Sequence, residues 1–245
     1  MAPKKLGFTV HVLDHASADE LRAKYKGHGV NFEDIEEVDY VWHDEPLHEL
    51  VGLEQCYDWI IASHVIEHTP DLISFLVERE RLLKPNGVLS LIIPDKRYCF
   101  DYFNAAKSIG ELLDAFEQRR KRSSPGKGFD HCASATKHNR RISWDADTQG
   151  LVQFVHEFSD AHSHWQRART TDEYIDVNNW RFTPASFHVL LGDLQALGLT
   201  GLEIKAEFVL VGCELHVTLG KSLSAQPMNR LLAVRCVLDE AHRSS

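Results

Sequence analysis

The pattern of hydrophobic positions is clearest between residues 57 and 101. Tyr57–Ala62 is a short apolar run with aromatic and β-branched residues, which is typical of a strand buried on both faces. Residues 69–83 have a helical period, residues 84–87 (KPNG) predict a turn, and Val88–Ile93 is a second buried strand. A strand, a helix and a strand in this order form a βαβ unit. This unit predicts an α/β fold with a parallel sheet and helices on both of its faces.

Shorter elements precede this unit. The expected elements are a strand ending at Asp14, a helix over Ala16–Lys26, a strand over Ile35–Trp42 and a short helix over Pro46–Leu53. Ser17 and Glu20 have the spacing of a capping box at the start of the first helix. Thr69 and Pro70 predict the start of the central helix, with Thr69 as its capping residue and Pro70 at the first helical position.

The pattern changes after Asp101. A helix over Ile109–Arg122 ends in a basic run, and residues 123–128 predict a loop. From there to residue 180 the chain is rich in His and Trp but only weakly periodic. We interpret residues 102–180 as a helix-rich insertion that forms a lid or a substrate wall.

The chain then returns to regular elements. These are a helix over Thr183–Leu197, a β-hairpin of Leu202–Leu210 and Cys213–Leu219 around Val211-Gly212, and a short terminal helix. Residues 1–101 and 181–221 are therefore expected to form one core. Residues 222–245 are expected to form a peripheral extension.

Composition limits the class of partner. The 245-residue chain has a formal net charge of −9 and a pI near 5.9, which argues against nucleic acid or an anionic membrane as its main partner. The basic run Arg119–Arg122 is therefore interpreted as a solvated helix end. The five cysteines are scattered and form no CxxC pair, so most are expected to be small buried hydrophobic residues. Because the chain has no signal peptide and no apolar run of about eighteen residues, we expect a cytoplasmic protein.

Polar residues follow the strands of the predicted sheet. Ser63 and His64 come after the first central strand, and Asp95-Lys96-Arg97 come after the second. Ligands of open α/β sheets bind at the carboxyl ends of strands, so these residues are expected to line a site. Asp14 ends its own strand, where a carboxylate is able to accept hydrogen bonds from both ribose hydroxyls of a nucleotide.

Residues 64–68, HVIEH, have the spelling of an inverted zinc-peptidase motif. That motif requires a helix, because two histidines four residues apart must face one metal. Here a strand ends directly before the motif and a helix is expected to begin directly after it. We therefore expect a strand-to-helix loop and no metal site.

The central stretch also carries a family resemblance. This stretch resembles the second half of a class I S-adenosylmethionine-dependent methyltransferase. The resemblance lies in the order of its parts: a strand, ASHVIEH, TPD, a helix, LLKPNG, a strand and PDKRYCFD. The resemblance is to the type 11/type 23 kind, in a branch often found beside glycan-biosynthesis enzymes. It extends to residues 12–17, 173–176 and 180–184, so it covers most of the chain.

The resemblance implies a Rossmann-like sheet that ends in the hairpin, with S-adenosylmethionine as cofactor. It implies methyl transfer to an oxygen of a small molecule or glycan precursor. Asp14 is then expected to bind the ribose, Asp39 the adenine amine, and Ser63 and His64 to position the cofactor. Some related O-methyltransferases bind a divalent cation through ExxEH in this loop, a pattern from which this chain departs at His64.

Methyl transfer to a hydroxyl needs in-line positioning and a base. The candidates for the base are His64, Asp95 and His131, with Asp101 and His138 as further choices. Candidates for holding an anionic substrate are Lys96, Arg97 and Arg181. Relatives tend to carry a histidine where this chain has Asn178-Asn179, which weakens a catalytic role there.

One expected part of the family pattern does not match. The first strand and its glycine-rich loop should precede Asp14, yet Gly7 is the only glycine before it. We consider three explanations: a mis-assigned start, a fragment that pairs with another chain, or a degenerate domain whose two halves close directly.

A catalytically inactive methyltransferase-like domain that acts as an interaction or regulatory module is therefore the alternative function, and a homodimer is left open. An NAD or nucleotide-sugar enzyme is disfavoured, because it too would need a glycine-rich loop.

Overall fold

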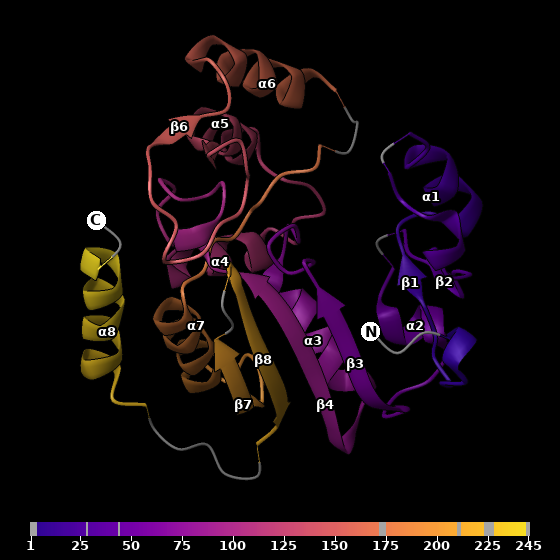
Figure 1. The fold of residues 1–245 in the computed structure, drawn as a ribbon. Coiled ribbons are helices and arrows are strands. Elements are labelled where there is room, and N and C mark those ends of the chain that lie inside the picture. The colour runs from indigo at the N-terminus through magenta and orange to yellow at the C-terminus, as the bar shows by residue number, and fades with distance from the viewer. Residues whose placement is uncertain are drawn as a thin grey trace.

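The computed structural model describes residues 4–27, 29–43, 45–171, 175–209, 212–222 and 228–243. Of the sequence features used above, Glu173, Tyr174, Leu210 and Val211 lie outside these residues. The described chain forms a four-stranded sheet, a separate two-stranded sheet and a small hairpin, with helices between them (Figure 1).

The main sheet confirms the predicted strand, helix and strand and the C-terminal hairpin. Its strands are β3 (Tyr57–Ser63), β4 (Leu83–Pro94), β8 (Glu214–Lys221) and β7 (Leu202–Val209), in that order. β3 and β4 are parallel, whereas β8 is antiparallel to both of its neighbours. This mixed α/β arrangement fits a Rossmann-like fold.

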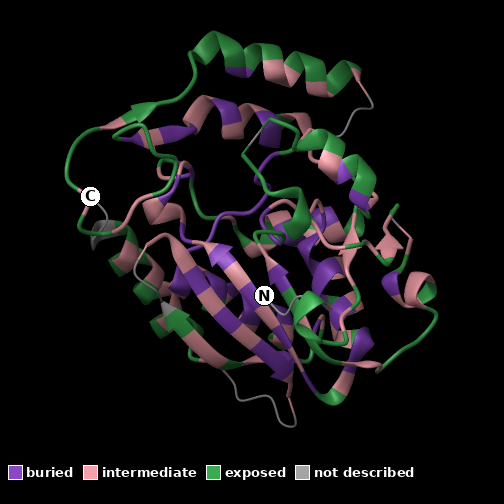
Figure 2. Ribbon diagram, turned by 45° about the vertical axis from the view of Figure 1, so that its right-hand side comes forward, coloured by how far each residue is buried: buried purple, intermediate pink, exposed green. Residues whose placement is uncertain are grey.

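Three helices cover one face of this sheet: α3 (Leu72–Leu82), α4 (Ile109–Glu117) and α7 (Pro184–Ala196). Leu89, Leu91 and Ile93 of β4 alternate toward this face and are buried among the helices. The other face is open among the described residues (Figure 2). Trp59 and Ile61 of β3 alternate with Ile60 and Ala62, which pack in the core, and they are 59% and 40% exposed. The expectations of helices on both faces and of a first strand buried on both faces are therefore wrong for this sheet.

The central helix begins two residues later than expected. Asp71, not Thr69, is its capping residue, because the Asp71 carboxylate accepts the backbone N–H of Ser74 at 3.0 Å. Residues 84–87 (KPNG) do not form the predicted turn before a strand, because β4 already starts at Leu83. They form an irregularity in the pairing of β4 with β3. Gly87 is required there, because an added Cβ would lie 2.7 Å from the carbonyl oxygen of Tyr57.

The N-terminal part forms its own small unit. β1 (Leu13–Asp14) and β2 (Tyr40–Val41) pair in parallel, beside α1 (Ala18–Lys24), a 3-10 turn (Phe32–Asp34) and α2 (Leu47–Val51). Ser17 forms the predicted capping box of α1. The two strands are much shorter than expected, and no backbone hydrogen bond joins β1 to β3 within the described chain.

His11 links this unit to the main sheet, because its Nδ1 atom lies 2.9 Å from the hydroxyl of Tyr57. A side-chain contact is not a strand pairing. Within the described residues, β1-β2 and the main sheet are therefore separate sheets.

The insertion contains α5 (Pro125–Ser134), α6 (Phe158–Thr170) and a hairpin of β5 (Thr136–His138) and β6 (Val152–Phe154). The loop expected over residues 123–128 is instead the start of α5, where Ser124 caps the helix and Pro125 takes its first position. α4 ends at Glu117, well before the expected Arg122. The last helix, α8 (Arg230–Arg243), packs on α7 at the edge of the molecule (Figure 1). No described helix combines the length and apolar composition needed to cross a bilayer.

Candidate active site

The loop that joins β3 to α3 carries the first part of the site. His64 follows β3 directly and has a φ of 52°, a left-handed conformation that few non-glycine residues adopt. Its backbone N–H donates to the carbonyl of Ile92 in β4, which fixes the loop at the carboxyl end of the sheet. Residues 64–68 form no helix, as the sequence context predicted. Within the described chain, no group of three or more His, Cys, Asp or Glu side chains is placed to hold a metal ion.

The imidazole of His64 lies between two carboxylates. Its Nδ1 atom is 3.4 Å from Glu67 Oε1, and its Nε2 atom is 3.1 Å from Glu214 Oε1. Glu67 and then Glu214 raise the pKa of His64 to about 9, although partial burial opposes them. His64 therefore carries a positive charge at neutral pH. A charged imidazole donates hydrogen bonds but is a poor base, which argues against the catalytic role predicted for it.

His68 pairs with Asp176. The His68 Nδ1 atom lies 2.9 Å from Asp176 Oδ1, and its Nε2 atom faces Glu67 Oε1 at 3.8 Å. Burial works to lower the pKa of His68, but Asp176 and Glu67 outweigh it and raise the pKa overall. A carboxylate that holds one ring nitrogen fixes the orientation of the imidazole, as in an oriented general base.

A second group of polar residues lies under the insertion. We call Asp101, Asn104, His131, Asn178 and Arg181 the Arg181 cluster. Asp101 Oδ1 accepts hydrogen bonds from Asn104 Nδ2 at 2.8 Å and from Arg181 Nε at 3.0 Å. Asp101 Oδ2 accepts one from Asn178 Nδ2 at 2.6 Å. Both oxygens of the Asp101 carboxylate are thus held by hydrogen bonds, which argues against its use as a base.

His131 of α5 closes this cluster. The backbone N–H of Asn178 donates to His131 Nδ1 at 3.3 Å, which places the proton of a neutral ring on Nε2. Burial lowers the pKa of His131, with Arg181 lowering it further against the opposing charge of Asp101. His131 is therefore neutral and presents a donor, so the structure supports a role in binding better than the predicted role as base.

Asp95 is held by Arg97. Arg97 Nε donates to Asp95 Oδ1 at 2.9 Å and Nη2 to Asp95 Oδ2 at 2.5 Å, and Asp95 also caps the short 3-10 turn after β4. The Asp95 side chain is only 3% exposed. Asp95 and Arg97 thus satisfy each other, and Lys96 donates to the carbonyl of Tyr102 at 2.9 Å. Neither the predicted base Asp95 nor the predicted anion holders Lys96 and Arg97 are free for a ligand in this arrangement.

The residues expected to bind the cofactor are only partly brought together. Asp14 ends β1, and one of its oxygens accepts the N–H of His15 at 2.7 Å, while the other accepts no hydrogen bond from a described residue. Asp39 precedes β2, at the opposite end of that strand pair, and it binds Lys4 Nζ at 2.5 Å and the N–H of Val12 at 2.6 Å. Burial acts to raise the pKa of Asp39, but these two partners outweigh it and lower the pKa. The structure therefore brings Asp14 to a strand end and places Asp39 elsewhere.

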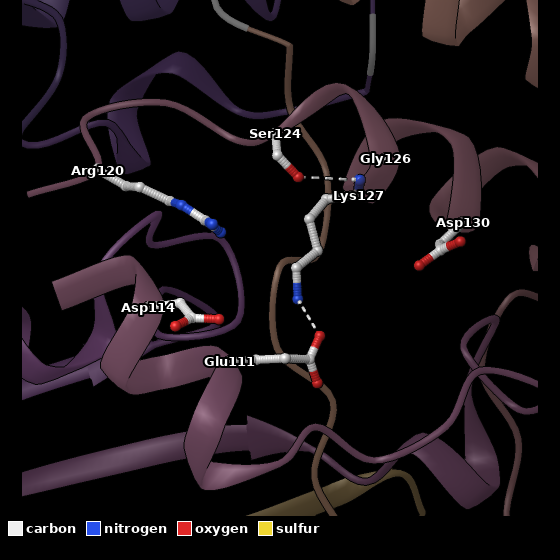
Figure 3. Close-up of a pocket in the computed structure, with 7 residues that line it drawn as sticks. All are labelled: Glu111, Asp114, Arg120, Ser124, Gly126, Lys127 and Asp130. Carbon is white, nitrogen blue, oxygen red and sulfur yellow. Dashed lines mark hydrogen bonds and ion pairs between the residues drawn. The ribbon is translucent and has the colours of Figure 1, made fainter. Parts of the chain in front are cut away.

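A cavity of about 270 Å³ lies between α4 and α5. Its lining residues are Glu111, Asp114, Arg120, Ser124, Gly126, Lys127 and Asp130 (Figure 3). Burial lowers the pKa of Lys127 to about 8, while Lys127 Nζ donates to Glu111 at 3.2 Å and to the carbonyl of Asn179 at 2.9 Å. The basic run was expected to be solvated, yet Arg120 lines this cavity.

Sequence reasoning missed several of these residues. Asp176, Asn178 and Lys127 lie in a weakly periodic stretch, where no pattern indicates which side chains turn inward. Glu67 and Glu214 are 147 positions apart, so the sequence gives no sign that they meet around His64. The only available signal was the HVIEH segment itself.

Comparisons with known proteins place the chain in a family. A family model described as a methyltransferase domain matches residues 2–159, so the chain belongs to this methyltransferase family. Among solved structures, the chain is similar to the PH0226 protein from Pyrococcus horikoshii OT3, with 16% sequence identity and a TM-score of 0.38. That match covers 89% of this chain and 74% of the other. No curated protein matches the chain.

Proposed function

We propose that this protein is an S-adenosylmethionine-dependent methyltransferase that methylates an oxygen of a small molecule or glycan precursor. The observation that supports this proposal best is the His68–Asp176 pair, whose atoms His68 Nδ1 and Asp176 Oδ1 are 2.9 Å apart. In a chain of the methyltransferase family, this pair lies at the carboxyl end of β3, where open α/β sheets bind their ligands.

The chain's own residues fit the cofactor in part. Asp14 offers a free carboxylate oxygen for a ribose hydroxyl, and Ser63 and the charged His64 would hold the polar methionine end. Asp39 is already occupied, and no glycine lies in the segments 15–17 and 42–46 that directly follow β1 and β2. When bound, S-adenosylmethionine supplies an electrophilic methyl group.

His68 is the best candidate for the base. His64 is charged, Asp95 is neutralised by Arg97, and His131 presents a donor nitrogen. His68 is oriented by Asp176 and keeps its Nε2 atom on the side of Glu67. In this proposal His68 accepts the proton of the acceptor's hydroxyl group, and the hydroxyl oxygen takes the methyl group. The bond that would break is the one between the methyl carbon and the sulfonium sulfur, with S-adenosylhomocysteine as the leaving group.

Calorimetric titration with S-adenosylhomocysteine tests the cofactor part of this proposal. We expect micromolar binding that Asp14→Ala abolishes, because the ribose hydroxyls lose their acceptor. Asp39→Asn is the matched control and should leave the affinity unchanged. Absence of binding to the well-folded wild-type chain would contradict the proposal.

A specific observation favours the alternative function, an inactive methyltransferase-like interaction module. The sheet is split between β1 and β3, and the open face of β3 displays Trp59 and Ile61. Under this alternative, the chain binds no S-adenosylhomocysteine but associates with itself or with another protein through that face. Sedimentation of the chain alone distinguishes a homodimer from a monomer.

A further inference from the structure

Some buried polar atoms in this protein have no hydrogen-bond partner. Among the described residues they are Glu67 Oε2, His138 Nδ1, His164 Nδ1, Asn178 Oδ1 and both Nη atoms of Arg181, apart from His68 Nδ1, which faces Asp176. Three of these atoms belong to the Arg181 cluster. An unsatisfied buried polar atom costs about 1–3 kcal/mol, and more when it is charged, so such a concentration needs a physical explanation.

The guanidinium group is oriented so that its outer edge is free. Asp101 takes only the Nε–H of Arg181, at 3.0 Å, and it also accepts hydrogen bonds from Asn104 and Asn178. Nη1 and Nη2 of Arg181 therefore point to no acceptor. Two parallel N–H groups at the end of a guanidinium match the two oxygens of an oxyanion.

The neighbouring atoms define what else the ligand carries. Asn178 Oδ1 is an acceptor without a donor, and its amide nitrogen is fixed by Asp101. Glu67 is joined to the same segment, because its carbonyl accepts the N–H of Asn179 at 2.6 Å, and its Oε2 atom is also an acceptor without a donor. Asn178 Oδ1, which belongs to the Arg181 cluster, is the acceptor that a hydroxyl group beside the oxyanion would use.

The charge balance favours a carboxylate over a phosphate. Asp101 already offsets part of the charge of Arg181, and Glu67 and Asp176 add further negative charge around His68. A singly charged planar group is tolerated there better than a dianion. Asp176 precedes Asn178 of the cluster by two positions, and its side chain is 63% exposed to solvent.

We propose that the Arg181 cluster binds the carboxylate of a hydroxycarboxylate acceptor, with Arg181 Nη1 and Nη2 on the carboxylate and Asn178 Oδ1 on a hydroxyl. This inference rests on the proposed function, since it names the substrate class of that site. The Nη atoms are closed off from solvent in the present arrangement.

Calorimetric titration of the full chain with glycolate, the smallest probe that carries both groups, tests this inference. Acetate lacks the hydroxyl, glycolamide lacks the charge, and inorganic phosphate is the other oxyanion; all are compared at constant ionic strength. We expect saturable binding of glycolate, with an affinity that falls in the order glycolate, acetate, glycolamide. Equal binding of glycolamide, or binding of phosphate without glycolate, would overturn the inference.

Arg181→Lys keeps the charge but removes the two parallel donors, and it should weaken glycolate binding by at least about tenfold. Arg230→Lys is the matched control, because Arg230 also pairs with an aspartate, Asp193, but far along the chain at α8. Unchanged binding in Arg181→Lys would overturn the inference. If this variant does not fold, Asn178→Ala serves instead and should lose the preference for glycolate over acetate; retention of that preference would overturn the inference.

These titrations contain no cofactor, so the two proposals fail separately. Glycolate binding without S-adenosylhomocysteine binding would contradict the methyltransferase proposal alone. The reverse result would contradict the hydroxycarboxylate proposal alone.

Discussion

Arg181 Nε donates a hydrogen bond to Asp101 Oδ1 at 3.0 Å, and the two side chains are only 0% and 2% exposed. Asp101 comes from the segment after β4, whereas Arg181 precedes α7 on the far side of the insertion. This ion pair therefore joins the two segments of the core that flank the insertion.

Asp101→Asn should lower the free energy of unfolding by about 3–5 kcal/mol, because it leaves the Arg181 charge buried and uncompensated. Urea unfolding measures this change. Glu54→Gln removes one partner of the exposed Glu54–Arg81 pair and should have little measurable effect. If Asp101→Asn lowers the free energy of unfolding by as little as Glu54→Gln does, the charge of Arg181 is compensated by another group.

His64 should make stability depend on pH. Its pKa is raised from the ordinary value near 6.5 to about 9 in the folded state. A raised folded-state pKa contributes stability that is fully present below pH 6.5 and is lost as the pH rises to about 9. His64→Asn, chosen because Asn tolerates a positive φ, should flatten the pH dependence over this window in urea unfolding. An NMR titration of His64 with a midpoint near 6.5 would contradict the pairing with Glu67 and Glu214.

The two faces of the sheet should respond differently to substitution. Trp59 is 59% exposed on the open face, so Trp59→Thr should change the free energy of unfolding by less than about 1 kcal/mol. Trp180 is 1% exposed in the core, and Trp180→Ala should cost about 3–5 kcal/mol. Urea unfolding of both variants checks the contrast. A large loss at Trp59 would show that this face is covered in solution.

The hydrophobic pattern predicted the main sheet well because local signals determine it. The strands around Ile60 and Leu91, the helix between them and the C-terminal hairpin were all expected. Burial of β3 was predicted wrongly, because an apolar run has the same composition whether or not a helix covers its second face. The site was less predictable still: HVIEH pointed to His64 and His68, but their partners Glu214 and Asp176 come from distant parts of the chain.

The start of α3 shows a smaller limit of the sequence pattern. Thr-Pro-Asp offers two capping residues, and the structure uses Asp71, which accepts both the N–H and the hydroxyl of Ser74. Asp71→Ala should therefore cost about 1 kcal/mol of stability. Thr69→Val, which removes only the bond from Thr69 to the carbonyl of Ile66, should cost less. If urea unfolding shows a larger loss of stability for Thr69→Val than for Asp71→Ala, Thr69 is the capping residue after all.

The His68–Asp176 pair leads to a prediction about catalysis. In Asp176→Asn the charge that raises the pKa of His68 is removed, so the pKa of His68 falls. If His68 is the base, the acid limb of the kcat/KM profile for methyl transfer should move to lower pH, and the maximum rate should fall because the ring loses its orientation. His68→Asn should lower kcat by about 10²–10⁴-fold at every pH. Glu207→Gln beside His188 is the matched control, since this pair lies between α7 and β7, and it should leave the profile unchanged. An acid limb that does not move in Asp176→Asn would show that another group accepts the proton.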